Sequence, residues 1–413
     1  MQPATAPFAE HGTKRLLTFV LRRFMIDGSL TVTWPDATTS VIGAGAPRAG
    51  FRLTSWRAAR RMITDPGLAL GECYMDETLV PEACSLRELL DLIGLNLPRA
   101  INRVPGIALS NAIGHVRRRI DQWNPARRAA RNVAHHYDID DEIYRSFLDA
   151  DMQYSCAYFA TGGESLDQAQ AAKKRLIAAK LLMTRPGLSV LDIGCGWGGL
   201  ALTLAREYGA TVTGITLSRE QCAHATARAE AAQLTGRVRF EICDYRAIAG
   251  QYDRVVSVGM FEHVGVMQYP AFFRAAARAL APDGVGLLHT IGRLDGPAHT
   301  NRWITRYIFP GGYAPALSEM MPGFEHAGLR LTDLEVLRGH YAETLRRWQR
   351  RFAENRERVA ARRDERFCRM WAFYLALSEL AFTRLDSAVF QLQFAHDPAA
   401  VPATRGYLIE AIG

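Results

Sequence analysis

Between residues 188 and 291, short apolar segments of strand length alternate with longer amphipathic segments of helical length. The predicted strands are 188–193, 211–216, 237–242, 253–258 and 284–290. The predicted helices between them are 198–208, 219–233 and 269–280. Because parallel strands need a crossover connection, this alternation is typical of a doubly wound parallel sheet with helices on both faces.

Two further apolar segments, 329–337 and 388–394, predict strands, and they enclose helical segments at about 343–363 and 366–384. A late pair of strands fits the mixed edge of the same sheet. The predicted fold class is therefore α/β, with a doubly wound, seven-stranded Rossmann-like sheet that carries a helical insertion.

The first third of the chain has a different pattern, in which short helices and short strands are mixed. The predicted helices are 13–25, 56–63 and 86–93, and the predicted strands are 29–34 and 51–55. We predict a small N-terminal α+β or helical domain over 1–131 and a second domain over 132–413. The boundary lies in an arginine-rich linker that Pro125 interrupts.

The strand predicted at 188–193 runs directly into a glycine-rich turn, VLDIGCGWGG at 190–199. An acid followed by G-x-G-x-G lets the backbone approach a nucleotide at the carboxyl end of a parallel strand. This spacing is the pattern of S-adenosylmethionine (SAM) methyltransferases, and a purely structural glycine turn is the alternative. The predicted cofactor residues of the turn are Asp192, Gly194, Gly196 and Trp197.

The ends of the next two strands supply further candidates for cofactor contacts. Most Rossmann-like sites carry an acid for the ribose after the second strand, and Thr216 stands there instead, followed by Leu217 and Gln221. After the third strand come Asp244 and Tyr245. Asp244 is a candidate acceptor for an adenine amino group, although a lone Asp in a loop is also a common turn residue.

The fourth and fifth strands end in residues that can carry chemistry. Glu262 and His263 follow the fourth strand, and His289 lies at the end of the fifth. Because ligands bind beyond the carboxyl ends of strands in open α/β sheets, we expect the three side chains to converge near the methyl donor. A zinc site is the competing use of such residues, but no pair has the spacing typical of zinc ligands, so no metal is predicted.

The basic charge of the chain leaves two interpretations open, a solvated surface and a surface for anionic phosphates. The formal net charge is +8, and only four of the 50 basic residues are lysine, so arginine, which suits bidentate phosphate contacts, predominates. The densest run is 117–131, and 342–370 holds ten arginines against five acids. Lipid headgroups and nucleic acid both fit such surfaces, and solvated helix faces are the plain alternative.

No apolar run approaches the length needed to span a bilayer, and the first ten residues lack the basic and apolar regions of a secretory signal. The expected location is therefore the cytoplasm.

With these motifs assembled, residues 132–395 resemble the cyclopropane-fatty-acyl-phospholipid synthase family, relatives of the mycolic acid cyclopropane synthases and methyltransferases. The matching stretches include HYDI at 136–139, MQYSCAYF at 152–159, VLDIGCGWGGL at 190–200, GITLSREQ at 214–221, SVGMFEHVG at 257–265, LLHTIG at 287–292, YIFPGG at 307–312 and HY at 340–341. Upstream, LGECYMD at 70–76 is similar to the signature of the small N-terminal domain in the phospholipid-acting members.

The resemblance implies a bicarbonate ion in the active site. The implied ligands are Cys156, Glu262, His289, Tyr341 and the backbone of Ile291. Of the SAM contacts described above, it implies Gly194, Gly196, Thr216, Leu217, Gln221 and Asp244, and it adds Tyr154 and Ser155. Members of the family have threonine at the position of Thr216, which accounts for the missing ribose acid.

The resemblance further implies methylene transfer from SAM to a cis double bond of a phospholipid acyl chain, through a carbocation that bicarbonate deprotonates to close a cyclopropane ring. A fatty acyl methyltransferase that leaves a methylene or methyl branch is the nearest alternative. A methyltransferase acting on a small molecule or nucleic acid, and a non-catalytic SAM-binding membrane protein, are more distant ones.

The partner implied by the resemblance is unsaturated phospholipid in an anionic membrane, reached by peripheral contact at the inner face of the cell membrane. Nucleic acid is not expected as a partner. The N-terminal domain is expected to handle lipid, and because family members are often dimers, a homodimer stays open.

Overall fold

The computed structural model describes residues 6–100, 103–104, 122 and 141–412. The chain forms two compact units. The first consists of residues 1–118 together with His299–Ile308 and Phe352–Leu385, and the second holds the remainder. The boundary predicted near residue 131 lies outside the described residues and stays a prediction. The prediction did not include the two later segments in the first unit.

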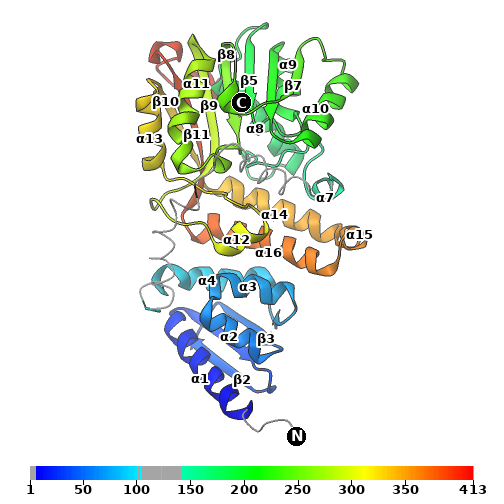
Figure 1. The fold of residues 1–413 in the computed structure, drawn as a ribbon, viewed down its shortest axis with the longest axis vertical. Helices are drawn as coiled ribbons and strands as arrows, with labels where there is room; N and C mark the ends of the chain where they lie inside the picture. Colours follow the sequence, from blue (N-terminus) through cyan, green and yellow to red (C-terminus); the bar gives the residue numbers. More distant parts are fainter. Residues whose placement is uncertain (1–5, 101–102, 105–121, 123–140, 413) are drawn as a thin grey trace. The chain divides into compact units, whose positions relative to one another are not determined.

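The second unit is built on a seven-stranded sheet (Figure 1). Its strand order is β10 (Arg330–Leu337), β11 (Ser387–Ala395), β9 (Leu280–Arg293), β8 (Tyr252–Val258), β5 (Ser189–Ile193), β6 (Thr211–Thr216) and β7 (Val238–Ile242). The strands from β9 to β7 are parallel, whereas β11 pairs antiparallel with both β9 and β10. The predicted α/β class, the seven strands and the mixed edge are confirmed.

Two hydrophobic cores lie on the two faces of this sheet, since alternate residues of each strand point to opposite sides. On one face, Val190 packs with helices α8 (Leu166–Lys180) and α9 (Gly199–Tyr208). On the other face, Leu191 packs with α11 (Tyr269–Ala279) and α13 (Leu317–His326). Helix α10 (Arg219–Ala231) connects β6 to β7.

The strand order reverses at β5, whose neighbours are β6 on one side and β8 on the other. At such a point the connections leave in opposite directions and open a crevice beyond the carboxyl ends of the strands. The topology therefore places a site after Ile193, Thr216 and Val258, the last residues of β5, β6 and β8.

The first unit is built on a four-stranded sheet of order β2 (Thr39–Ala44), β1 (Gly28–Thr33), β3 (Arg48–Leu53) and β4 (Leu79–Pro81). Strands β1 and β3 are parallel, and the other two pairs are antiparallel. The N-terminal helices are α1 (Ala6–Phe24), α2 (Trp56–Thr64), α3 (Pro66–Met75) and α4 (Leu86–Ala100). Helix α12 (Arg302–Tyr307) packs on α3, and α16 (Glu365–Arg384), which contacts α15 (Arg356–Arg362), packs on both α3 and α4.

Several elements differ from the prediction. Strands β2 and β4 and helices α3, α8, α12 and α13 were not predicted, and β9 is longer at both ends than 284–290. The helix expected over 343–363 is divided at Asn355 into α14 (Arg338–Glu354) and α15. No helix in the described part of the chain is both long and apolar enough to cross a membrane.

Candidate functional site

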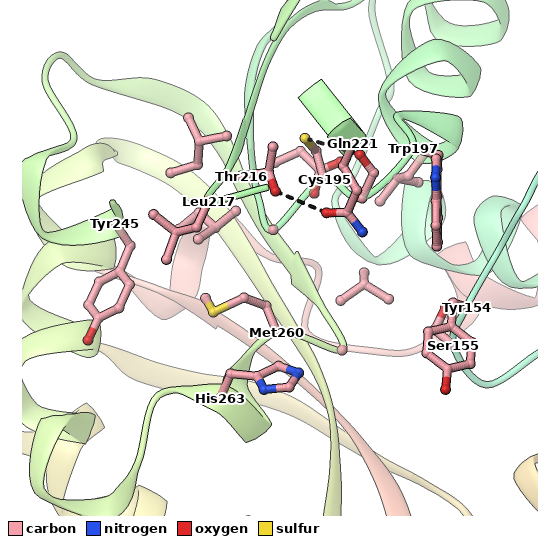
Figure 2. Close-up of a pocket in the computed structure, with 18 of the residues that line it drawn as sticks. Tyr154, Ser155, Cys195, Trp197, Thr216, Leu217, Gln221, Tyr245, Met260 and His263 are labelled. Atoms are coloured by element: carbon pink, nitrogen blue, oxygen red, sulfur yellow. Dashed lines mark hydrogen bonds between the residues drawn. The ribbon is translucent and has the colours of Figure 1, made fainter. Parts of the chain in front are cut away.

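A cavity lies beyond the carboxyl ends of β5, β6 and β8, where the topology places a site (Figure 2). Its wall comes from the glycine turn after β5, the ends of β6 and β8, and a segment before α8. The sequence-predicted residues that line it are Tyr154, Ser155, Asp192, Gly194, Gly196, Trp197, Thr216, Leu217, Gln221 and Tyr245. Ten of the eleven predicted cofactor residues are therefore brought together around one space.

The backbone conformation of the turn after β5 favours glycine. Gly194, Gly196 and Gly198 have φ values of +83°, +54° and +81°, in the left-handed region that side chains disfavour. A Cβ on Gly194 would also lie 2.6 Å from the Cβ of Met260. The bare backbone thus lines the cavity where a ligand can approach it closely.

The polar group after β6 is held by local hydrogen bonds. Thr216 Oγ1 donates to Gln221 Oε1 at 3.0 Å (Figure 2). The Ser218 amide donates to Thr216 Oγ1 at 3.2 Å. Ser218 caps α10 by accepting from the Gln221 amide at 3.2 Å. Because the cap fixes the first turn of α10, Thr216 and Gln221 present their polar atoms to the cavity in one arrangement.

Asp192 lines the cavity at the end of β5 and is almost fully buried. Burial raises the pKa of its carboxyl to about 7, and the positive charge of Lys173 opposes that rise. Its Oδ2 has no hydrogen-bond partner among the described residues. A buried acceptor without a partner is costly, so this atom is available to a ligand in the cavity.

Asp244 is the predicted cofactor residue that does not line the cavity. Its carboxylate forms an ion pair with Arg246, with distances of 2.7 Å to Nε and 2.8 Å to Nη2. Arg246 lines the cavity, and its guanidinium lies 5.0 Å from the ring centre of Tyr245. A contact of Asp244 with adenine stays a prediction, and its side chain would have to share its lone pairs with this arginine.

Two of the five predicted catalytic residues are in direct contact. Glu262, on the 3₁₀ turn after β8, accepts a hydrogen bond through Oε1 from the Ile291 amide of β9 at 2.6 Å. Its Oε2 is inaccessible and has no partner among the described residues. Burial raises the pKa of Glu262 to about 7, although the bond from Ile291 opposes the shift.

His289 lies two residues before Ile291 and therefore on the same face of β9. It is buried, and its Nδ1 lies 3.1 Å from Gln391 Nε2. Burial lowers its pKa to about 3, with the charges of Lys173 and Lys180 adding to the effect. The imidazole is neutral at physiological pH, so it can orient a ligand without bringing a charge.

Cys156 and Tyr341 are linked to each other through helix α14. Cys156 is buried, which raises the pKa of its thiol, and the next amide, of Ala157, donates to Thr344 Oγ1 of α14 at 3.0 Å. Tyr341 is one turn earlier on α14 and packs edge-on against Trp348. Trp348 also packs 5.3 Å from Tyr154, which links this group to the cavity wall.

The structure adds cavity residues that the prediction did not contain. They include Met152, Gln153, Cys195, Arg246, Met260 and His263. His263 was singled out at its strand end but not assigned to the cofactor, and burial lowers its pKa to about 4. The signal for Met260 and His263 was their position beside Glu262, whereas nothing in the sequence distinguished Gln153 from its neighbours.

Comparison with known proteins agrees with this geometry. The family model described as mycolic acid cyclopropane synthetase matches residues 124–392. The chain is 35% identical to the cyclopropane-fatty-acyl-phospholipid synthase of Escherichia coli K12 over 352 residues, which are 85% of this chain and 88% of that protein. It is 36% identical to a tuberculostearic acid methyltransferase of Mycobacterium tuberculosis over 379 residues, 88% of this chain and 87% of that one.

A solved structure extends the comparison to three dimensions. A mycolic acid cyclopropane synthase in complex with SAH and CTAB superposes with a TM-score of 0.62 and 32% identity. The match covers 66% of this chain and 99% of that chain.

Proposed function

The chain belongs to the mycolic acid cyclopropane synthetase family, and from this premise we propose that it cyclopropanates phospholipid acyl chains. It is a SAM-dependent methyltransferase by family and by fold. The proposed reaction moves a methylene group from SAM to the cis double bond of an unsaturated acyl chain in a phospholipid.

The observation that carries the proposal is the position of Glu262. Met260 and His263, on either side of it, both line the cavity, while its own Oε2 is buried without a partner among the described residues. A carboxyl group held out of water beside a SAM cavity suits a reaction in which positive charge develops nearby.

An isolated alkene is a weak nucleophile, so its attack on a methyl group leaves positive charge on the acyl chain. SAM, when bound, supplies an electrophilic methyl group on its sulfonium. The residues of this chain that would stabilise the charge are the Glu262 carboxylate and the aromatic rings of Tyr154 and Trp197, both of which line the cavity.

The chemistry of the predicted ligand set suits a bicarbonate ion. Oε2 of Glu262 lacks a partner among the described residues, the raised pKa of Cys156 keeps its thiol protonated, and His289 is neutral. In the proposed site these groups, with Tyr341 and the Ile291 amide, would hold the ion by hydrogen bonds, although that amide also donates to Glu262. Bound there, the ion would supply a base for the proton that ring closure releases.

A membrane is the proposed location of the substrate, which implies peripheral contact at the inner face of the cell membrane. The basic charge supports it, but many arginines of 342–370 are already paired within the protein. Arg346 and Arg347 pair with Glu343, and Arg356 pairs with Glu365. The basic run at 117–131 lies outside the described residues, so its part in the contact rests on the sequence alone.

The proposal is tested by incubating the purified protein with SAM and vesicles of cis-monounsaturated phospholipid, followed by mass spectrometry and proton NMR of the acyl chains. We expect a chain heavier by one CH2, without the alkene and with upfield ring protons. Vesicles of the trans isomer are the matched control. The same mass with a retained alkene would indicate the branched product, and no mass change would reject a bilayer substrate.

Membrane contact is tested by sedimentation with anionic vesicles. Replacing Arg117, Arg118 and Arg119 with Ala should reduce the bound fraction and flatten its dependence on salt, because exposed charges are screened by ions. Unchanged sedimentation would show that these three arginines do not contribute to vesicle binding.

A further inference from the structure

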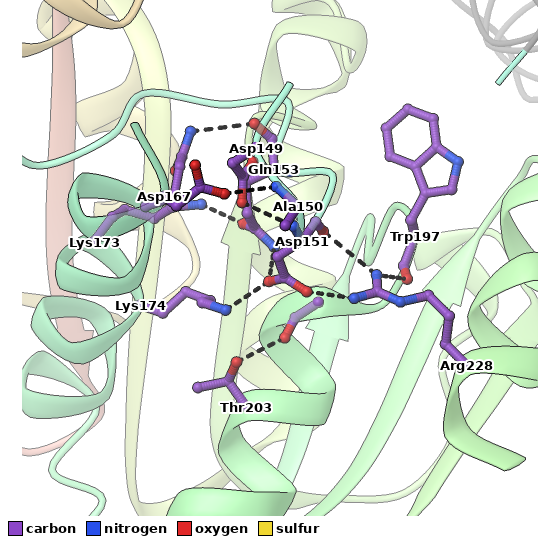
Figure 3. A network of polar contacts seen from close by, with 12 residues as sticks. Asp149, Ala150, Asp151, Gln153, Asp167, Lys173, Lys174, Trp197, Thr203 and Arg228 are labelled. Carbon is purple, nitrogen blue, oxygen red and sulfur yellow. Dashed lines mark hydrogen bonds and ion pairs between the residues drawn. The ribbon is translucent and has the colours of Figure 1, made fainter. Parts of the chain in front are cut away.

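A buried lysine, Lys173 of α8, lies behind the wall of the cavity (Figure 3). Only 1% of its surface is exposed, and it does not line the cavity itself. Lysine is among the residues least often fully buried, because its ammonium loses water unless it is paired.

The ammonium of Lys173 donates to two side chains of the cavity wall. It bonds Ser155 Oγ at 3.0 Å and also Gln153 Oε1, and both residues line the cavity. Gln170, one turn earlier on α8, donates to the backbone oxygens of the same two residues at 3.2 and 2.9 Å. Helix α8 therefore holds this part of the wall through side-chain and main-chain atoms together.

A second set of polar contacts holds the same segment from its other side. Asp151 accepts from Gln153 Nε2 at 3.0 Å and from Lys174 at 2.6 Å, and it pairs with Arg228 (Figure 3). Arg228 also donates to the Trp197 carbonyl at 2.7 Å. The network thus joins the 151–155 segment to the glycine turn. Among its three cations, Lys173 bonds the side chains of Gln153 and Ser155, whereas Lys174 and Arg228 bond Asp151.

The charge of Lys173 also shifts the pKa of residues in the predicted cofactor site and in the predicted anion site. It lowers the pKa of Asp192 at the cofactor turn against the effect of burial. It acts in the same direction on Cys156 and His289, which belong to the predicted anion site. One buried cation is therefore within electrostatic range of the cofactor turn and of the residues expected to hold the anion.

We propose that Lys173 is a positioning residue for the SAM cavity, which fixes the side chains of Gln153 and Ser155 in the wall and sets the charge opposite Asp192. The inference rests on the proposed function only in taking this cavity as the cofactor site. Lys173 does not line the cavity, so it would affect the affinity for the cofactor only through the wall residues and through its positive charge.

The test measures the dissociation constant of S-adenosylhomocysteine (SAH) by calorimetry, which requires no turnover. Lys173→Met keeps the length of the side chain and removes its charge, and we expect SAH affinity to fall about tenfold or more, as for lost charge-assisted hydrogen bonds. Lys173→Arg keeps the charge and should recover part of the affinity, which a merely space-filling role would not predict.

Lys180→Met is the matched control. Lys180 is on the same helix, is fully buried and pairs with Glu335 and Asp333 of β10, away from the cavity lining. Its replacement should destabilise the fold and leave the affinity for SAH unchanged. Equal affinities of wild type and Lys173→Met, or equal losses in both methionine variants, would overturn the proposal.

If Lys173→Met does not fold, the pH dependence of wild-type affinity decides. Burial lowers the pKa of Lys173 to about 8, so its charge is lost as the pH rises through that value. The other titratable groups that act on it or that it acts on are Asp149, Asp151, Cys156, Lys174, Asp192 and His289. Asp192 and Glu262 both titrate near 7, so the comparison starts above that pH.

SAH should bind more weakly as the pH passes about 8, beyond the change caused by its own amino group, which a reference titration of free SAH provides. A profile explained by SAH alone would overturn the proposal. A wild-type protein that forms the lipid product but shows no effect of Lys173 would reject this inference alone. Absence of SAH binding by the wild type would reject the proposed cofactor site as well.

Discussion

Two glutamates, Glu72 in the first unit and Glu262 in the second, differ in what surrounds their carboxylates. Glu72 of α3, in the first unit, pairs with Arg61, accepts from Tyr307 Oη at 2.7 Å and lies 3.4 Å from Arg306. Glu262, in the second unit, has the Ile291 amide on one oxygen and no partner on the other among the described residues. The first carboxylate is matched by cations, and the second is not.

Under the proposed function, the carboxylate of Glu72 is structural and that of Glu262 is reactive. A buried carboxylate that is paired contributes to the fold, and removing its partners is costly. A buried carboxylate without a cation instead has a raised pKa, about 7 for Glu262, and Oε2 of Glu262 has no partner among the described residues. Burial alone therefore does not distinguish the two residues, and the proposal that Glu262 is catalytic rests on its missing counter-charge.

The largest expected effect is on turnover. Glu262→Gln should lower kcat on the order of 10³-fold, because an amide cannot provide the negative charge opposite the developing cation. The affinity for SAH should change little, since Glu262 does not line the cavity. Product analysis gives the rate and calorimetry gives the affinity. Full activity in a folded Glu262→Gln variant would remove Glu262 from the mechanism.

The matching substitution in the first unit should affect stability instead. Glu72→Gln keeps a group that can accept from Tyr307 but loses its charge opposite Arg61, and the free energy of unfolding should fall by about 2 kcal/mol. The value stays modest because both arginines are partly exposed. Urea titration measures it, and SAH affinity should be unchanged. If Glu72→Gln left stability unchanged but abolished turnover, Glu72 would not be a structural residue of the kind proposed here.

The pH dependence of kcat sharpens the assignment to Glu262. Since burial raises its pKa to about 7, the carboxylate is protonated below that pH and ionised above it. At saturating SAM and lipid, kcat should rise about tenfold per pH unit below 7 and level off above it. A flat profile across pH 7 would show that the ionised form is not required.

The smallest effect is expected at an exposed ion pair of the first unit, Arg302 with Asp65. The arginine side chain is 64% exposed, so water and salt screen the pair. Arg302→Met should change the free energy of unfolding by less than about 1 kcal/mol. If the free energy of unfolding fell as much as in Glu72→Gln, burial would not explain the difference between the Arg302–Asp65 and Arg61–Glu72 pairs.

The sheet of the second unit could be predicted because its central strands β5 and β9 contain buried apolar runs, and helical segments alternate with the strands. Strand β2 could not, since its sequence TSVIGA is half polar and lies at a sheet edge. Helix α8 has little amphipathic pattern, although Ser165 and Gln168 form a capping box that its sequence contains.

The cofactor cavity could be predicted because its residues follow directly after strands. The contact between Glu262 and the Ile291 amide depends on the register of β8 against β9, which the sequence does not specify. The role of Lys173 was out of reach for a different reason. A lysine in a helix is normally solvated, and only the packed structure brings it against Gln153 and Ser155.

Ring closure on a phospholipid acyl chain can be followed with SAM that carries a trideuterated methyl group. Lipid from vesicles of cis-monounsaturated phospholipid is analysed by mass spectrometry and NMR. If the enzyme forms a cyclopropane, the acyl chain loses its alkene. The ring then keeps two of the three deuterium atoms, since a base removes one. A chain that keeps all three and retains an alkene would contradict ring closure.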